Sequence, residues 1–109
     1  FRASAQAFET DAQARAVTRY ALDMAFDQQL EEAQRLFLYL PLEHSEEMAD
    51  QDRSVELIGQ LTSQPMWLDY AEKHRAVIAR FGRFPHRNAV LGRESTPEER
   101  AFLEDGPGW

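Results

Sequence analysis

The chain has 109 residues, of which 43% are hydrophobic and 28% are charged, and its formal net charge is −7. This length suits one compact domain and is too short for two, and the composition is that of a soluble folded protein. The negative charge argues against nucleic acid as the main partner, because a phosphate backbone requires a basic face. No apolar run is long enough to cross a membrane, and the absence of cysteine fits the cytoplasmic location that we expect.

Helical periodicity dominates the sequence and strand-like alternation is almost absent, which predicts an all-α domain. Thr10 or Asp11 is expected to cap a first helix that runs to about Phe26. The inward stripe of this helix is predicted to combine alanines with larger apolar side chains, among them Val17 and Met24.

The second and third helices are predicted on either side of a proline. The second covers roughly residues 31–40, and its apolar C-terminal half indicates burial on several sides. Pro41 is expected to break or kink it, because proline lacks an amide donor and clashes with the preceding turn. The third helix is expected from about Ser45, its predicted cap, to Leu61.

The fourth helix, over 65–81, has the strongest pattern, and Gly82 is expected to end it in the left-handed conformation. A short helical piece is predicted near 87–91. Thr96 is then the expected cap of a last helix, with proline at its first position and Glu99 closing a capping box. This helix is predicted to end at the glycines and proline of 106–108.

Five helices with short connections predict antiparallel pairs stacked side by side in a tetratricopeptide-like array, as one domain over residues 1–109. The sequence contains no internal repeat of the usual helical-repeat length. Because the chain starts at Phe1 and not at methionine, we expect that it lacks N-terminal helices of a longer protein.

Two segments contain polar residues in a pattern that indicates a site. The acidic joint, 41–47, connects the second and third helices. The arginine turn, 80–88, places three arginines, a histidine and an asparagine among two phenylalanines and a proline. Such donors suit a carboxylate or a phosphate. The candidate ligand-binding residues in and beside these segments are Glu43, His44, Glu46, Asp50, Arg83, His86, Arg87 and Asn88.

Both segments also have a structural interpretation. Glu46 and Glu47 can offset the dipole of the third helix, and the arginines can pair with the acidic residues of 43–56 inside the fold. His74, on the apolar stripe of the fourth helix, is interpreted as a core residue whose ring is hydrogen-bonded, and the aromatic residues of that stripe as core.

Metal and nucleophile motifs are absent from the sequence. Its histidines, His44, His74 and His86, form no ligating pair on one helix, so we predict no zinc site and no cofactor. A hard cation held by the carboxylates of 43–56 stays an alternative. No serine lies in a glycine-flanked nucleophile turn, and the glycines form no phosphate-binding loop.

Segments 36–46, 49–51, 80–88 and 91–99, with Arg53, resemble a bacterial family catalogued as domain of unknown function 924. The resemblance covers nearly the whole chain. It implies a tetratricopeptide-like helical fold with further N-terminal helices, and no activity, since none is assigned to the family. It places on the family's motifs the residues Glu43, His44, Ser45, Glu46, Asp50, Arg83, His86, Arg87 and Asn88.

The leading hypothesis is a non-enzymatic helical module that binds a peptide or an anionic small molecule in a groove between the acidic joint and the arginine turn. One alternative is a small hydrolase or lyase in which His44 or His86 is the acid–base group and an arginine holds the anion. Another is an oligomeric scaffold, and the oligomeric state is left open. The first two require the acidic joint and the arginine turn to meet around a common hollow.

Overall fold

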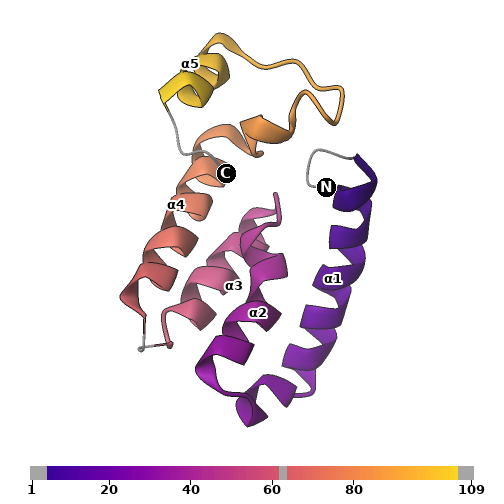
Figure 1. Cartoon of the computed structure of the whole chain (residues 1–109), viewed down its shortest axis with the longest axis vertical. Helices are drawn as coiled ribbons and strands as arrows, with labels where there is room; N and C mark the ends of the chain where they lie inside the picture. The colour runs from indigo at the N-terminus through magenta and orange to yellow at the C-terminus, as the bar shows by residue number, and fades with distance from the viewer. Residues whose placement is uncertain (1–4, 62–63, 106–109) are drawn as a thin grey trace.

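The computed structural model of the protein describes residues 5–61 and 64–105, with side chains from residue 12 onward. Over these residues the chain forms five α-helices and no strand, which confirms the predicted all-α class (Figure 1). The α-helices are α1 (Ala5–Asp23), α2 (Glu32–Glu43), α3 (Met48–Ile58), α4 (Pro65–Phe81) and α5 (Pro97–Asp105). Two 3-10 helices are η1 (Phe26–Gln29) and η2 (Pro85–Arg87). None of the described helices combines the length and the apolar character of a membrane span.

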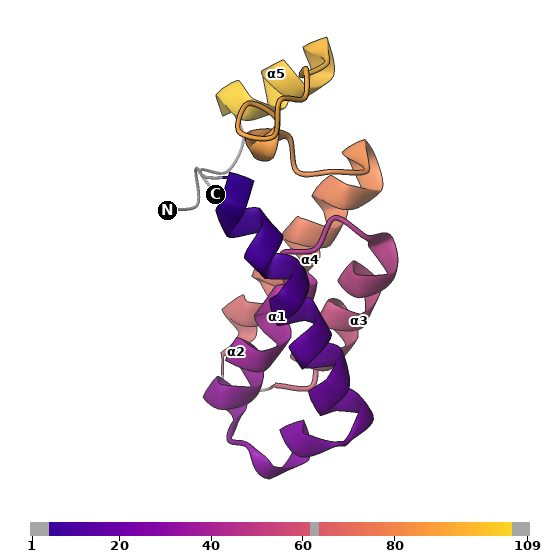
Figure 2. The ribbon, with the colours of Figure 1, turned by 90° about the vertical axis from the view of Figure 1, so that its right-hand side faces the viewer.

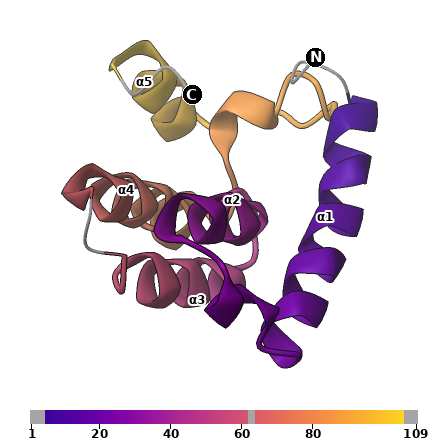
Figure 3. The same cartoon turned by 60° about the horizontal axis from the view of Figure 1, so that its bottom comes forward.

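Successive helices from α1 to α4 run in alternating directions (Figure 1). Helix α3 packs against both α2 and α4, and α1 packs mainly against α2. Viewed from the end of the bundle, α2, α3 and α4 form one group and α1 lies to its side (Figure 3). Helix α5 lies beyond the end of α4 (Figure 2). The predicted antiparallel pairing is therefore confirmed, while a tetratricopeptide-type array stays a prediction.

Helix α1 differs from its predicted bounds. It begins at Ala5 and ends at Asp23, so the expected caps Thr10 and Asp11 lie within the helix and the prediction was wrong there. The chain leaves the helix at Ala25, which has a positive φ of 56°, and enters η1.

The inward face of α1 also differs from the predicted stripe. Val17 and Met24 are 64% and 52% exposed, whereas Thr18 and Ala21 are buried. The Thr18 hydroxyl donates to the carbonyl oxygen of Leu38 over 2.7 Å. Small side chains let α1 approach α2 closely enough for this bond, whereas Val17 and Met24 face outward and Leu22 packs against the core.

Helix α2 continues through Pro41 to Glu43, so the proline does not break it. The last turn is held by burial, since Leu42 is fully buried. Helix α3 is shorter than predicted, because it begins at Met48 and not after Ser45, and it ends at Ile58.

The predicted bounds of α4 are confirmed, because Gly82 has φ 74° and its amide donates to the Ile78 carbonyl over 2.8 Å. The capping box of α5 is also confirmed. The Glu99 amide donates to the Thr96 hydroxyl over 3.1 Å, and the Thr96 amide donates to the Glu99 carboxylate over 2.9 Å. The predicted helical piece at 87–91 is replaced by η2 and turns, and the predicted stop at 106–108 lies outside the described residues.

Two apolar clusters hold the described helices together. The first, between α2, α3 and α4, is centred on Tyr39 and Ile58. The second places Phe84 of the arginine turn against Val77 and Ile78 at the end of α4. Burial of one such side chain stabilises a protein by roughly 1.5–3 kcal/mol. The second cluster therefore fixes the arginine turn against the end of α4.

Candidate functional site

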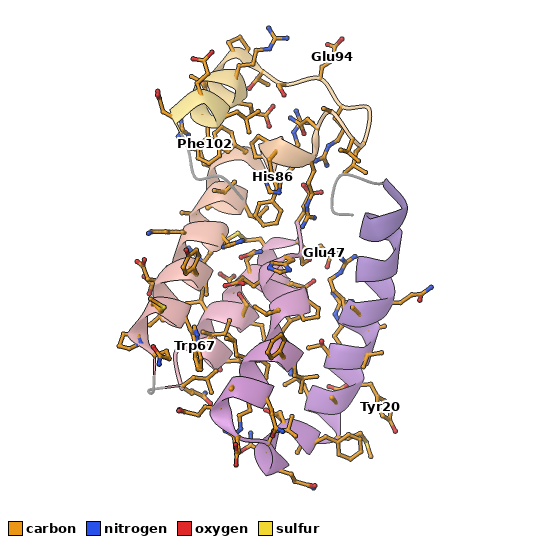
Figure 4. The ribbon with its side chains drawn as sticks, in the orientation of Figure 1. Tyr20, Glu47, Trp67, His86, Glu94 and Phe102 are labelled. Carbon is orange, nitrogen blue, oxygen red and sulfur yellow. The ribbon has the colours of Figure 1, made fainter. Side chains whose placement is uncertain are left out.

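The acidic joint and the arginine turn are in direct contact, as the sequence predicted. The Phe84 amide donates to the Glu46 carboxylate over 2.6 Å, and the Arg87 guanidinium donates to the His44 carbonyl over 2.8 Å. Figure 4 shows His86 on η2 above Glu47, the residue that precedes α3. Local turn chemistry at Gly82 and packing of Phe84 bring these distant segments together.

Glu46 is the centre of this contact. Its two carboxylate oxygens each accept a hydrogen bond of 3.0 Å from Arg93, in addition to the bond from the Phe84 amide. Burial alone would raise the pKa of Glu46, but these hydrogen bonds and the charge of Arg93 hold the pKa below its usual value. Glu46 is therefore a fixed anion that joins the two segments.

Arg83 is engaged in a second internal pair. It donates to both oxygens of Glu99, over 2.9 and 2.7 Å, and to the Glu94 carbonyl over 2.7 Å. Glu99 is 2% exposed. The Arg83 hydrogen bonds, opposed by burial and helped by the Thr96 amide, lower the pKa of Glu99 to about 2. This pair attaches the arginine turn to α5.

The remaining predicted polar residues have partners within the fold as well. Asn88 accepts from Arg93 and donates to the Ser95 hydroxyl, both over 3.1 Å. The His86 ring lies against Phe84, with centroids 5.7 Å apart. The structural interpretation of the arginine turn thus accounts for these contacts, and ligand binding by its residues stays a prediction.

Asp50 belongs to a separate pair on the α1 side of the joint. It accepts from Arg19 and from the Ser45 hydroxyl, each over 2.7 Å. Burial would raise the pKa of Asp50, but these two hydrogen bonds outweigh burial and the pKa lies below its usual value. The Ser45 hydroxyl also accepts the Glu47 amide over 3.1 Å, so Ser45 orders the turn before α3.

A cavity of about 330 Å³ lies on another side of the acidic joint, between α2 and α4. We call it the α2–α4 pocket. Its described lining includes no residue of the arginine turn, so the hollow is not the shared one that the hypotheses required. The lining residues are Leu36, Leu40, Glu43, His44, Trp67, Tyr70 and His74.

Three lining residues form the polar end of this pocket. Glu43 is 4% exposed, and burial raises its pKa to about 7. Its Oε2 lies 3.6 Å from His44 Nε2. The rings of His44 and His74 are 5.8 Å apart between centroids. One ligating atom from each of Glu43, His44 and His74 lies within 4.8 Å of the others.

The orientation of His74 follows from its hydrogen bond. Its Nδ1 lies 2.8 Å from the Tyr70 carbonyl oxygen, which has no proton to donate, so Nδ1 is the protonated nitrogen. In the neutral form of this ring, the lone pair is on Nε2. A hydrogen bond of this kind fixes both the tautomer and the ring of a histidine.

The backbone under Glu43 and His44 is held by buried side chains. Gln51, fully buried, donates to the carbonyls of Glu43 and Ser45 over 2.5 and 2.7 Å, and Arg87 donates to the carbonyl between them. The last carbonyls of a helix have no partner within it, so these bonds also complete the end of α2. Through Arg87, the arginine turn thereby helps to fix the backbone of His44, which lines the pocket.

The sequence analysis did not find the α4 side of the pocket. The core interpretation is confirmed for His74, which is buried with its ring hydrogen-bonded, and for Trp67, which packs against the first apolar cluster. It was wrong for Tyr70, which is 51% exposed, and all three side chains also line the cavity. Their spacing of three and four residues already placed them on one face, with a histidine among aromatic residues. The zinc argument considered pairs on one helix, whereas this group combines α2 and α4.

These features define an all-α protein of antiparallel helices with a polar-ended pocket between α2 and α4. The chain belongs to the family described as "Bacterial protein of unknown function (DUF924)", which it matches over residues 1–107, and this confirms the resemblance. It is similar to the solved structure of the protein of unknown function ATU0120 from Agrobacterium tumefaciens, with 45% identity and a TM-score of 0.91. The similarity covers 97% of this chain and 59% of that chain, so this chain spans about 59% of that protein's length. No curated protein matches the sequence.

Proposed function

We propose that the protein is a helical binding module and that the α2–α4 pocket is its binding site. The ligand is a small molecule or a peptide side chain with an apolar body and a polar end. The observation that carries the proposal is the lining itself, which has four apolar or aromatic side chains and three convergent polar ones. This is the usual composition of small-molecule sites.

The apolar walls suit a flat or aliphatic group. Leu36 and Leu40 come from one side, and Trp67 and Tyr70 from the other. Aromatic side chains provide large contact areas at a low cost in conformational entropy. Because half of the Tyr70 surface is exposed, a ligand can bury it without displacing core side chains.

The predicted groove beside the arginine turn receives less support than this pocket. An anion at Arg83 would have to replace Glu99, which is buried, doubly hydrogen-bonded and part of a helix cap. Separating such a pair leaves a buried charge without compensation. The predicted anionic or peptide ligand is therefore better placed in the α2–α4 pocket.

We also propose a tetratricopeptide-like array and a cytoplasmic location. The short antiparallel hairpins support a tetratricopeptide-like array, and a cytoplasmic location is proposed on the cysteine-free composition. The hydrolase or lyase alternative stays a prediction: the pocket contains His44 and the Glu43 carboxyl, but its described lining includes no arginine. The oligomeric alternative gains support from the exposed Val17, Tyr20 and Met24, which share one face of α1.

Calorimetric titration with octanol, octanoate and octylamine tests the binding proposal, because these probes share a tail and differ in the head group. We expect binding of at least one probe. Tyr70→Ala should weaken it about tenfold, which corresponds to about 1.4 kcal/mol of lost contact.

Tyr20→Ala is the matched control, since Tyr20 is 61% exposed on α1, away from the pocket. It should bind like the wild type. Absence of binding for all three probes, or an equal loss in both tyrosine variants, would contradict the α2–α4 pocket as a binding site.

A further inference from the structure

The polar end of the α2–α4 pocket brings together a carboxylate and two imidazoles, a donor set that suits zinc and related transition metals. The ligating atoms of Glu43, His44 and His74 lie within 4.8 Å of one another. Magnesium and calcium prefer sets made of oxygen ligands. The chemistry of the cluster therefore selects for a borderline-soft divalent ion.

The spacing is close to that of a bound ion. Ligand bonds of 2.0–2.2 Å in a tetrahedral site place the ligating atoms about 3.4 Å apart. Glu43 Oε2 and His44 Nε2 are already 3.6 Å apart. No pair of these atoms is more than 4.8 Å apart, so the remaining adjustment is at most about 1.4 Å.

The surroundings of the cluster provide independent support. Metal-binding histidines commonly donate their second ring N–H to a carbonyl or a carboxylate, which orients the ring. His74 does this through Nδ1 to the Tyr70 carbonyl. Glu43 and His44 lie on a backbone stretch whose carbonyls accept hydrogen bonds from Gln51 and Arg87. All three side chains are thus placed by buried, hydrogen-bonded supports.

We propose that Glu43, His44 and His74 bind one divalent transition metal ion, preferably zinc, and that a further coordination position opens onto the α2–α4 pocket. Three protein ligands with one open position are typical of zinc sites that bind a small molecule directly. The proposal deepens the binding function above and rests on it for the role of the open position.

The metal ion also explains how an anionic ligand fits beside Glu43. A carboxylate head group placed directly against a buried glutamate would meet like charge. A divalent ion between them supplies the positive charge and accepts the head group as its next ligand. The predicted ligand is then an apolar group that ends in a carboxylate or a similar anion.

The test uses the untagged full chain after a chelator has removed bound metal. The chain is titrated with Zn²⁺ by calorimetry, and with Co²⁺ by visible absorption. We expect one equivalent of either metal, a Co²⁺ band typical of four or five ligands, and no binding of Mg²⁺. Glu43→Gln and His74→Asn should each weaken Zn²⁺ binding more than about a hundredfold, beyond the loss usual for outer-shell partners.

His86→Asn is the matched control, because it removes the histidine outside the cluster by the same substitution. It should bind Zn²⁺ like the wild type, and circular dichroism should show all variants folded. Absence of stoichiometric binding, or an equal loss in His74→Asn and His86→Asn, would overturn the metal site.

The octyl probes separate this proposal from the binding function. With Zn²⁺ bound, octanoate should bind at least about tenfold more tightly, which corresponds to about 1.4 kcal/mol, while octanol should be unchanged. Octanol binding without any Zn²⁺ binding would sink the metal site and leave the pocket. Zn²⁺ binding with no response to any probe would uphold the metal site and remove the proposed ligand class.

Discussion

Two buried glutamates show how differently this molecule uses the same side chain. Glu99, 2% exposed, faces the Arg83 guanidinium and a helix cap, and its pKa falls to about 2. Glu43, 4% exposed, faces two imidazoles and a cavity, and burial raises its pKa to about 7. A buried carboxylate with a full set of donors stabilises the fold, whereas a buried carboxyl beside a cavity is a candidate for a site.

The same contrast separates the two segments that the sequence singled out. The arginine turn contacts carboxylates and carbonyls at distances of 2.6–2.9 Å and attaches α5 to the rest of the chain. The acidic joint directs Glu46 into that network and directs Glu43 and His44 toward the α2–α4 pocket. A structural half and a proposed binding half thus meet within four residues.

The largest expected effect on stability comes from the structural half. Glu46→Ala removes the carboxylate that accepts from Arg93 and from the Phe84 amide, and should lower the free energy of unfolding by about 2–3 kcal/mol in urea denaturation. Glu47→Ala, the neighbouring change at an exposed side chain, should stay within about 0.5 kcal/mol. Equal losses of stability in the two variants would contradict a special role of the Glu46 hydrogen-bond network.

A smaller effect is expected from pH. Because the pKa of Glu99 is lower in the folded chain, at about 2, than in the unfolded chain, its stabilisation is present above about pH 4.5. It should be lost as the pH falls toward 2. In thermal melts, Glu99→Gln should melt about 5 °C below the wild type at pH 6, and the gap should close by about pH 2. A gap that persists at pH 2 would show that the ion pair is not its source.

Local chemistry explains which parts of the fold were predictable. The bounds of α4 and the start of α5 follow from Gly82 and from the reciprocal bonds of Thr96 and Glu99, which operate within a few residues. The face of α1 was mispredicted because Thr18 reaches the backbone of α2, a contact that no local pattern contains. The end of α2 was mispredicted for a similar reason, because burial of Leu42 stabilises the helical turn that follows Pro41.

The sequence predicted one part of the candidate site and not the other. The meeting of the acidic joint with the arginine turn was inferred from residue types and is confirmed. The α2–α4 pocket was not, because His74 lies thirty positions beyond His44 along the chain. The approach of His74 to Glu43 depends on how α2 and α4 pack against α3, which lies in contact with both. Helical periodicity predicts which face of each helix is buried, but not how the helices are rotated relative to one another.

The central claim is that Glu43 serves the proposed metal site and Glu99 stabilises the fold. Zinc titration of the paired variants Glu43→Gln and Glu99→Gln, together with their melting temperatures at pH 7, tests this claim most directly. The amide keeps the shape of each buried side chain while removing its charge. We predict that Glu43→Gln loses zinc and keeps its melting temperature, and that Glu99→Gln melts lower and keeps zinc. The reverse pattern, or loss of both zinc binding and melting temperature in both variants, would contradict this claim.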